Sequence, residues 1–275
     1  MNRCTLCPHN CTIFENETGI CGMRKNINGK LVDVNYGKIS SIALDPIEKK
    51  PLYMFHPGTH ILSIGSFGCN FHCPFCQNYD ISLAYKESLQ SAEYFTPKQI
   101  VDLAKKTIPD GNIGVAYTYN EPFIGYEFSY DCSAKVHEAG LLNVIVTNGY
   151  INREPLEAIL PNIDAMNIDL KGFSEDFYKK VGGHLKDVKK TIEFAQRNCH
   201  VEVTTLIIPG ENDSAQEIAE LSSWLASLDP DIPLHLTRFF PRHKYSGRTP
   251  TPPEIIYKLR EVAKEHLRNV FIGNC

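Results

Sequence analysis

The chain has 275 residues, 43% of them hydrophobic, which is enough apolar material for one sizeable core. Its formal charge of −4 provides no basic face, so we expect no nucleic-acid partner. The opening residues MNRCTLCPHN lack an apolar signal region, and no later run approaches the roughly 18 apolar residues of a membrane span, so we expect no membrane partner and a cytoplasmic location.

The first part of the chain, residues 1–58, is predicted to be a small cysteine-rich accessory segment. Its short cysteine spacings indicate metal ligation rather than disulfides in a chain without a secretion signal. Four thiolates either close a tetrahedral zinc site or occupy all corners of an iron–sulfur cluster, and the spacing does not separate these two. Residues 29–44 alternate like a small hairpin. The four cysteines of this second metal site are Cys4, Cys7, Cys11 and Cys21.

The remainder, residues 59–275, is predicted to be one α/β domain. Short β-rich runs occur at 60–65, 112–118, 142–147, 165–170, 200–208, 233–239 and 269–273. Segments of helical period lie at 97–107, 125–140, 153–160, 186–198, 215–228 and 252–266, the first with Thr96 as its expected N-cap. Strands separated by helices run parallel, so we expect a partial or complete parallel (β/α) TIM-type barrel. Its chemistry should lie in the loops at the C-terminal strand ends.

The loop after the first of these strands, GCNFHCPFCQN, holds three cysteines: Cys69, Cys73 and Cys76. Thiolates bind iron–sulfur clusters, and a four-iron cluster held by three cysteines keeps one iron without a protein ligand. An open coordination position distinguishes a catalytic metal centre from a closed structural one. The alternative is a zinc knuckle that takes its fourth ligand from His72 or elsewhere.

Polar residues also follow the third and fourth strands, in VTNG and NIDLKG. Asn148 offers both a donor and an acceptor, while Asp169 and Lys171 point to the same side of their strand because they are two residues apart. A carboxylate and an ammonium group in one interior are costly unless they are paired or bound to a ligand. We therefore expect ligand and substrate to bind at these strand ends.

The three-cysteine loop after a first barrel strand resembles the signature of the radical S-adenosylmethionine (SAM) superfamily. The resemblance implies a [4Fe–4S] cluster whose unligated iron chelates SAM. It implies reductive cleavage of SAM to a 5′-deoxyadenosyl radical, which abstracts hydrogen from an unknown substrate, with a protein among the candidates. It also implies an anaerobic oxidoreductase served by a one-electron donor such as flavodoxin or ferredoxin. The residues implied in SAM binding are Asn120, Glu121, Asn148, Asp169 and Lys171.

Over nearly its whole length the chain resembles the radical SAM proteins of the AmmeMemoRadiSam system, a branch related to the activating enzymes of pyruvate formate-lyase. The motifs that carry this resemblance are the N-terminal cysteines, EKKPLYMFHPG, VAYTYNEP, VTNG and NIDLKG. The pyruvate formate-lyase activators have an Asp directly before their Thr-Asn-Gly where this chain has Val146, so the resemblance does not extend to their cation site. Two alternatives remain: an activating enzyme of a glycyl radical enzyme, and an iron–sulfur or zinc-binding interaction or electron-transfer module.

Two further places at the strand ends carry candidate groups. His235 and Arg238 could bind a carboxylate of SAM or of the substrate, or they could be ordinary surface charges. Cys275 follows the last strand and is either a ligand or hydrogen donor at the same mouth, or part of a frayed tail.

Overall fold

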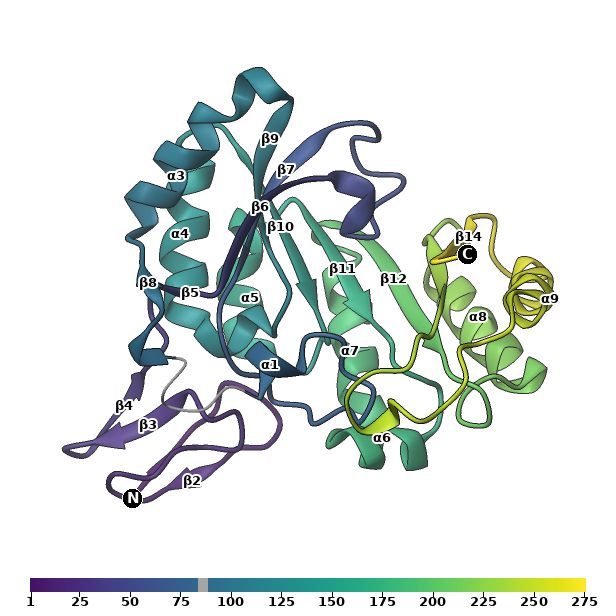
Figure 1. Cartoon of the computed structure of the whole chain (residues 1–275), viewed down its shortest axis with the longest axis horizontal. Helices are drawn as coiled ribbons and strands as arrows, with labels where there is room; N and C mark the ends of the chain where they lie inside the picture. Colours follow the sequence, from purple (N-terminus) through teal and green to yellow (C-terminus); the bar gives the residue numbers. More distant parts are fainter. Residues whose placement is uncertain (84–88) are drawn as a thin grey trace.

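The computed structural model describes residues 1–83 and 89–275, and its centre is an eight-stranded sheet (Figure 1). β6 (Ser41–Pro46) forms one edge and runs antiparallel to its neighbour. The other seven strands are parallel and follow in chain order to the opposite edge: β7 (His60–Gly65), β9 (Asn112–Tyr117), β10 (Leu142–Thr147), β11 (Ala165–Asp169), β12 (His200–Ile207), β13 (Leu234–Arg238) and β14 (Val270–Gly273). In the described residues β6 and β14 do not pair, so the barrel is open. The predicted partial parallel barrel is confirmed.

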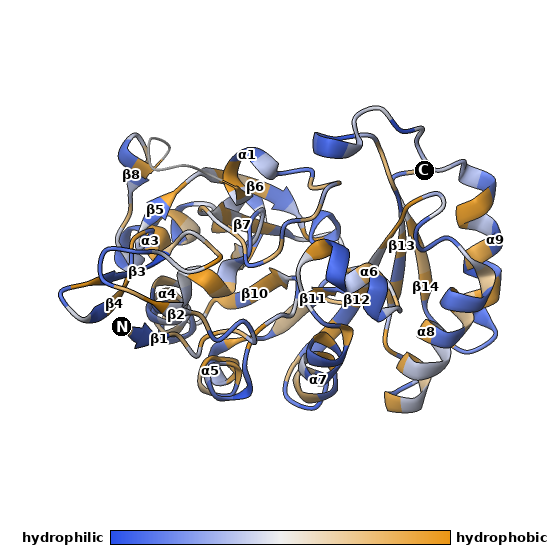
Figure 2. Cartoon of the chain, turned by 90° about the horizontal axis from the view of Figure 1, so that it is seen from below, coloured by the Kyte–Doolittle hydropathy of each residue, from blue (hydrophilic) through white to orange (hydrophobic). Residues whose placement is uncertain are grey.

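Helices connect the parallel strands and pack on the outer face of the sheet, as Figure 2 shows for α5, α7 and α8. Thr96 caps the first long helix through a capping box with Gln99, as the sequence predicts. No helix in the described part of the chain is long and apolar enough to cross a membrane. The helices are α1 (Tyr79–Ser82), α3 (Pro97–Lys106), α4 (Tyr126–Glu138), α5 (Arg153–Ile159), α6 (Glu175–Val181), α7 (Leu185–Ala195), α8 (Ala215–Leu228) and α9 (Pro253–Lys264).

The interior of the open barrel is apolar at one end and polar at the other. The segment 47–55 enters the N-terminal end, where Pro51 O accepts a hydrogen bond of 2.8 Å from Asn167 Nδ2. Further along the strands the inward positions become polar, because strand alternation directs Asn167, Asp169 and Thr204 to one face. The barrel therefore has a closed end at the N-termini of its strands and an open end at their C-termini. The apolar cluster at the closed end comprises Ile47, Leu52, Ile61, Ala116, Val144 and Ala165.

The N-terminal segment forms small two-stranded sheets beside the barrel. The predicted hairpin over 29–44 is wrong, since its three strands pair with three different partners. An Asn-Gly turn at 28–29, with both residues at positive φ, joins β3 to β4 instead, the usual chemistry of a tight hairpin. β6 belongs to the main sheet, while the predicted domain boundary at residue 58 stays a prediction. The small strands are β1 (Asn2–Arg3), β2 (Thr12–Ile13), β3 (Arg24–Ile27), β4 (Lys30–Asp33), β5 (Lys38–Ile39) and β8 (Glu93–Tyr94).

Candidate active site

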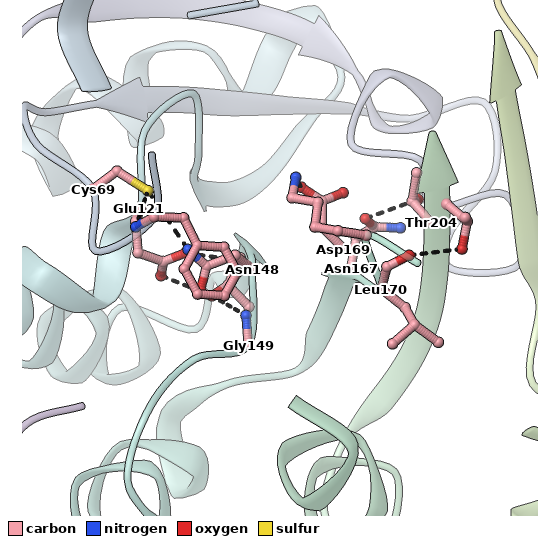
Figure 3. Close-up of polar contacts among 12 residues, drawn as sticks. Cys69, Glu121, Asn148, Gly149, Asn167, Asp169, Leu170 and Thr204 are labelled. Atoms are coloured by element: carbon pink, nitrogen blue, oxygen red, sulfur yellow. Dashed lines mark hydrogen bonds and ion pairs between the residues drawn. The ribbon is translucent and has the colours of Figure 1, made fainter. Parts of the chain in front are cut away.

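A cavity of about 1210 Å³, counted with its open mouth, lies at the C-terminal ends of the strands. Figure 3 shows its two sides, with Cys69, Glu121 and Asn148 on one and Asp169, Asn167 and Thr204 on the other. The structure thus brings to one cavity all the residues that the sequence assigned to the cluster loop and to SAM: Cys69, Cys73, Cys76, Asn120, Glu121, Asn148, Asp169 and Lys171.

The cysteine loop presents sulfur atoms to this cavity between two buried aromatic rings, Phe71 and Phe75. Cys69 Sγ accepts a hydrogen bond from the backbone N–H of Phe71 at 3.3 Å and from Asn148 Nδ2 at 3.6 Å. Burial raises the pKa of the Cys73 thiol to about 12 and that of Cys69 well above its usual value. The metal-free thiols therefore keep their protons near neutral pH, and metal binding has to release them.

Glu121 joins two strand ends beside the cysteine loop. Its Oε1 accepts hydrogen bonds from Phe123 N at 3.0 Å and Thr147 Oγ1 at 2.7 Å, and its Oε2 accepts one from Asn148 N at 2.8 Å. Burial, together with the negative charge of nearby Asp169, raises the pKa of Glu121 to about 7, although the three hydrogen-bond donors act to lower it. The carboxylate is thus already used to hold the loop after β10 against the loop after β9.

The two asparagines of the predicted SAM set hold the same loops. Asn120 Oδ1 accepts a hydrogen bond from Ser66 N at 2.9 Å, and its Nδ2 donates to Gly68 O at 3.1 Å. Asn148 Nδ2 donates to Asn70 Oδ1 at 2.8 Å. Asn120 therefore holds the backbone before Cys69 and Asn148 holds the side chain of Asn70 after it, a role that the sequence did not indicate.

Asp169 and Lys171 form the charged pair that the sequence predicted, with Lys171 Nζ 2.5 Å from Asp169 Oδ2. Burial lowers the pKa of Lys171, but the carboxylate of Asp169 and the nearby cysteines outweigh it, so the pKa is raised. Both side chains keep part of their surface exposed to the cavity, 18% for the lysine and 30% for the aspartate. They remain accessible to a bound ligand.

The floor of the cavity contains residues that sequence reasoning missed. Lys50 is only 2% exposed, and its Nζ donates to Asp45 Oδ2 at 2.7 Å and lies 4.8 Å above the ring of Tyr119. The Tyr119 hydroxyl donates to the same oxygen at 2.7 Å, which holds this residue at a φ of +73°, rare for a bulky side chain. The motifs EKKPLYMFHPG and VAYTYNEP meet here, and their presence in one sequence was the available signal.

The remaining candidates lie away from the cavity. His235 is buried one layer deeper, and its Nε2 lies 2.6 Å from Glu202 Oε2. Arg238 is three residues further along β13 and therefore faces the other side, where its Nε donates to Thr251 O at 2.6 Å. Neither residue lines the cavity, so the structure does not support the predicted role of His235 and Arg238 in binding a carboxylate there. Cys275 is exposed, whereas the preceding Asn274 reaches the cavity lining.

The four N-terminal cysteines surround a second, smaller cavity together with His9, Arg24 and Ile124. At neither cavity do the sulfurs converge as for a single metal ion. Across residues 1–83 and 89–275, no three His, Cys, Asp or Glu side chains lie close enough together to hold one ion. A cluster with several metal atoms spreads its cysteine ligands over a wider span, because each thiolate binds a different iron.

Sequence comparison connects this site to known proteins. The family model for the radical SAM superfamily matches residues 63–222. The uncharacterized protein MJ0808 of Methanocaldococcus jannaschii is 45% identical over 277 residues, which cover 99% of this chain and 81% of that protein. The 4-hydroxyphenylacetate decarboxylase activating enzyme of Clostridioides difficile is 24% identical over 161 residues, or 56% of this chain, so the match spans about half (51%) of that enzyme.

Structural comparison agrees at the level of the fold. A domain of the pyruvate-formate lyase-activating enzyme from Bacteroides vulgatus superposes with a TM-score of 0.51. The match covers 58% of this chain and 99% of that domain at 19% sequence identity. At this identity the likeness concerns the arrangement of strands and helices around the cavity.

Proposed function

This chain belongs to the radical SAM superfamily and is an enzyme, and we propose that Cys69, Cys73 and Cys76 hold a [4Fe–4S] cluster beside which SAM binds in the large cavity. The observation that carries the proposal is the convergence of these three sulfurs with the predicted SAM residues in one cavity. When reduced, such a cluster supplies the electron that cleaves SAM, and the resulting 5′-deoxyadenosyl radical abstracts a hydrogen atom from the substrate.

The residues around the cavity have two roles: some hold the loops in place, and others are available to bind SAM. Asn120, Glu121 and Asn148 hold the cysteine loop and the loop after β10 in place, since their hydrogen bonds are made to the protein itself. Asp169 and Lys171 are partly exposed, so their charges are available to the amino and carboxylate groups of SAM. Phe71 and Phe75 exclude water from the sulfurs. Exclusion of water protects a reactive intermediate in the cavity from side reactions.

The substrate in this proposal is a partner protein that reaches the cavity through the open side of the barrel. Support comes from the relatives named as activating enzymes and from the unpaired edges β6 and β14. Val146 lines the cavity where the pyruvate formate-lyase activators carry an Asp. A glycyl radical enzyme is therefore one candidate partner rather than the expected one. A flavodoxin or ferredoxin as electron donor and a cytoplasmic location stay predictions.

The decisive experiment is anaerobic reconstitution with iron and sulfide, followed by reduction with dithionite in the presence of SAM. We expect 5′-deoxyadenosine from the wild-type chain and none from Cys73→Ala, while the matched control Cys199→Ala, which lies outside the cavity lining, retains formation of 5′-deoxyadenosine. Equal amounts of 5′-deoxyadenosine from wild type and Cys73→Ala would refute the proposal. Binding of metal without any SAM cleavage would favour the interaction or electron-transfer module.

The partner is tested separately. Candidate glycyl radical enzymes are incubated with the reduced enzyme and SAM, and the electron paramagnetic resonance (EPR) spectrum of a glycyl radical is sought. A glycyl radical would establish the activating reaction. Its absence, with 5′-deoxyadenosine still formed, would direct the search to other proteins and to small molecules.

A further inference from the structure

The N-terminal cysteine site lies directly against the loop that carries Cys69. His9, two residues after Cys7, places its Nε2 2.8 Å from the backbone oxygen of Asn70. Met23, two residues after Cys21, packs with Phe67 and Ile124 in a small apolar cluster. The two cysteine sites therefore share a packed boundary.

The segments that carry the N-terminal cysteines contact the residues on either side of Cys69. On one side, the backbone oxygen of Asn70 lies 2.8 Å from Nε2 of His9, two residues after Cys7. On the other side, a Cβ at Gly68 would lie 2.9 Å from the carbonyl oxygen of Cys21, so the two backbones touch. Gly68 also has a φ of +87°, which together with this contact restricts the position to glycine.

Both polar atoms of the Asn70 side chain are hydrogen-bonded, which holds this side chain in one position. Its Nδ2 donates to Tyr150 O at 2.8 Å, and its Oδ1 accepts from Asn148 Nδ2 at 2.8 Å. The same Asn148 amide group also reaches Cys69 Sγ. A short route of covalent and hydrogen bonds thus runs from Cys7 along the chain to His9, from His9 to Asn70, and through Asn148 to Cys69.

We propose that Cys4, Cys7, Cys11 and Cys21 hold a second iron–sulfur cluster, which passes electrons to the catalytic cluster through Asn70 and Gly68. This inference rests on the proposed function of the three-cysteine loop. A one-electron donor protein reduces the N-terminal cluster by one electron, and the same electron moves on to the catalytic cluster. No bond is formed or broken in this relay, and the N-terminal cluster returns to its oxidised state.

The position of the site favours this assignment over a structural zinc ion. The four sulfurs line one cavity, and the segments that carry them contact both neighbours of Cys69. A purely structural ion would have no need of these contacts. With all four sulfurs bound to it, the second cluster would have no free iron for SAM, which suits electron transfer rather than catalysis.

The metal content is tested in the full-length triple variant Cys69→Ala/Cys73→Ala/Cys76→Ala, reconstituted anaerobically with iron, zinc and sulfide all supplied. We expect retained iron and sulfide, no stoichiometric zinc, and an iron–sulfur EPR signal after dithionite. Zinc without iron in this variant would overturn the inference. It would leave the proposed function intact, because that function depends on 5′-deoxyadenosine formation by the wild-type enzyme under dithionite.

The relay is tested by the rate at which a reduced flavodoxin or ferredoxin reduces the catalytic cluster, followed by rapid-freeze EPR without SAM. Asn70→Leu removes the hydrogen bonds at nearly constant volume, and we expect loss of the fast reduction phase at unchanged iron content. Asn152→Leu is the matched control. Asn152 Nδ2 also joins the N-terminal segment to the barrel, through Thr5 O at 2.7 Å, but no described hydrogen bond leads from it to Asn70 or Gly68.

The control variant should reduce as fast as wild type. An unchanged fast phase in Asn70→Leu would refute the route. A fast phase that persists in Cys7→Ser/Cys11→Ser, with the N-terminal iron gone, would refute the relay itself. Failure of the wild-type enzyme to cleave SAM under dithionite would instead refute the proposed function.

Discussion

The two ends of the barrel each bury one glutamate among hydrogen-bond donors, yet the pKa values of the two carboxyl groups move in opposite directions. Glu121 at the open end accepts hydrogen bonds from two backbone N–H groups and one hydroxyl, and burial raises its pKa to about 7. At the closed end, burial also acts to raise the pKa of Glu202. The side chains of His200 and His235 and two backbone N–H groups outweigh burial and lower it to about 2.

The two glutamates differ because Glu202 stabilises the closed end of the barrel, whereas Glu121 lies beside the cavity at the open end. Glu202 Oε1 and Oε2 accept hydrogen bonds from Met54 N at 2.8 Å and Tyr53 N at 3.0 Å, so a fixed charge anchors the segment that closes the barrel. Glu121 holds loops at the cavity with a charge that is only marginally stable at neutral pH. Substitutions at the closed end should therefore affect stability, and those at the open end should affect SAM chemistry.

The largest effect on stability is expected for Glu202→Leu. Removal of this buried acceptor leaves two backbone N–H groups and two imidazoles unpaired, which should lower the free energy of unfolding by about 3 kcal/mol or more. Urea denaturation measures the loss. Glu202→Gln keeps an acceptor oxygen and should lose less. Equal stabilities of the leucine variant and wild type would contradict the role of Glu202 as an anchor.

At the open end, Asp169→Asn should reduce the rate of 5′-deoxyadenosine formation by about a hundredfold, because a partly exposed charge positioned for SAM is removed. The urea midpoint should change little. Asp176→Asn also removes an aspartate paired with a lysine, but at an exposed position, and serves as the control. A stability loss as large as that of Glu202→Leu would erase the distinction between the two ends.

Lys50→Met probes the floor where the two ends meet. The nearly buried ammonium group is lost, but Asp45 keeps its contacts to Lys49 and Tyr119, so we expect a moderate loss of about 1 to 2 kcal/mol in unfolding free energy. Lys49→Met, in which a 67% exposed partner of the same aspartate is removed, should have little effect. Identical urea midpoints for both variants would show that burial of Lys50 has no energetic consequence.

The smallest and most diagnostic effect is the pH dependence of the unfolding free energy. Protonated Glu121 suits its buried site, so its contribution is complete below the ordinary pKa of 4.5 and is lost as the pH rises towards about 7. Ionised Glu202 contributes fully above 4.5, and this contribution is lost as the pH falls towards about 2. Stability differences between wild type and Glu121→Gln or Glu202→Gln should therefore slope in opposite directions. Parallel slopes would contradict the comparison.

Much of the fold was predictable because strand and helix periodicity is a local property. All seven parallel strands and the helix over 215–228 appear where the pattern places them. The cysteine loop and the polar residues after β9, β10 and β11 were predictable for a related reason, since parallel strands bring their C-terminal ends to one edge. The short helix α6 was missed.

The sequence by itself determined the three-cysteine loop, the parallel strands and the gathering of polar residues at one end of the sheet. These depend on spacing and alternation along the chain. Only the tertiary structure decided that Glu121 holds loops, that His235 faces Glu202 rather than the cavity, that Lys50 reaches the floor, and that Asn70 links the two cysteine sites. Glu121 and Thr147 lie 26 positions apart in the sequence, and His235 and Glu202 lie 33 apart, whereas Lys50 and Asp45 are a local pair. The distant partners become neighbours only when the strands assemble into one sheet.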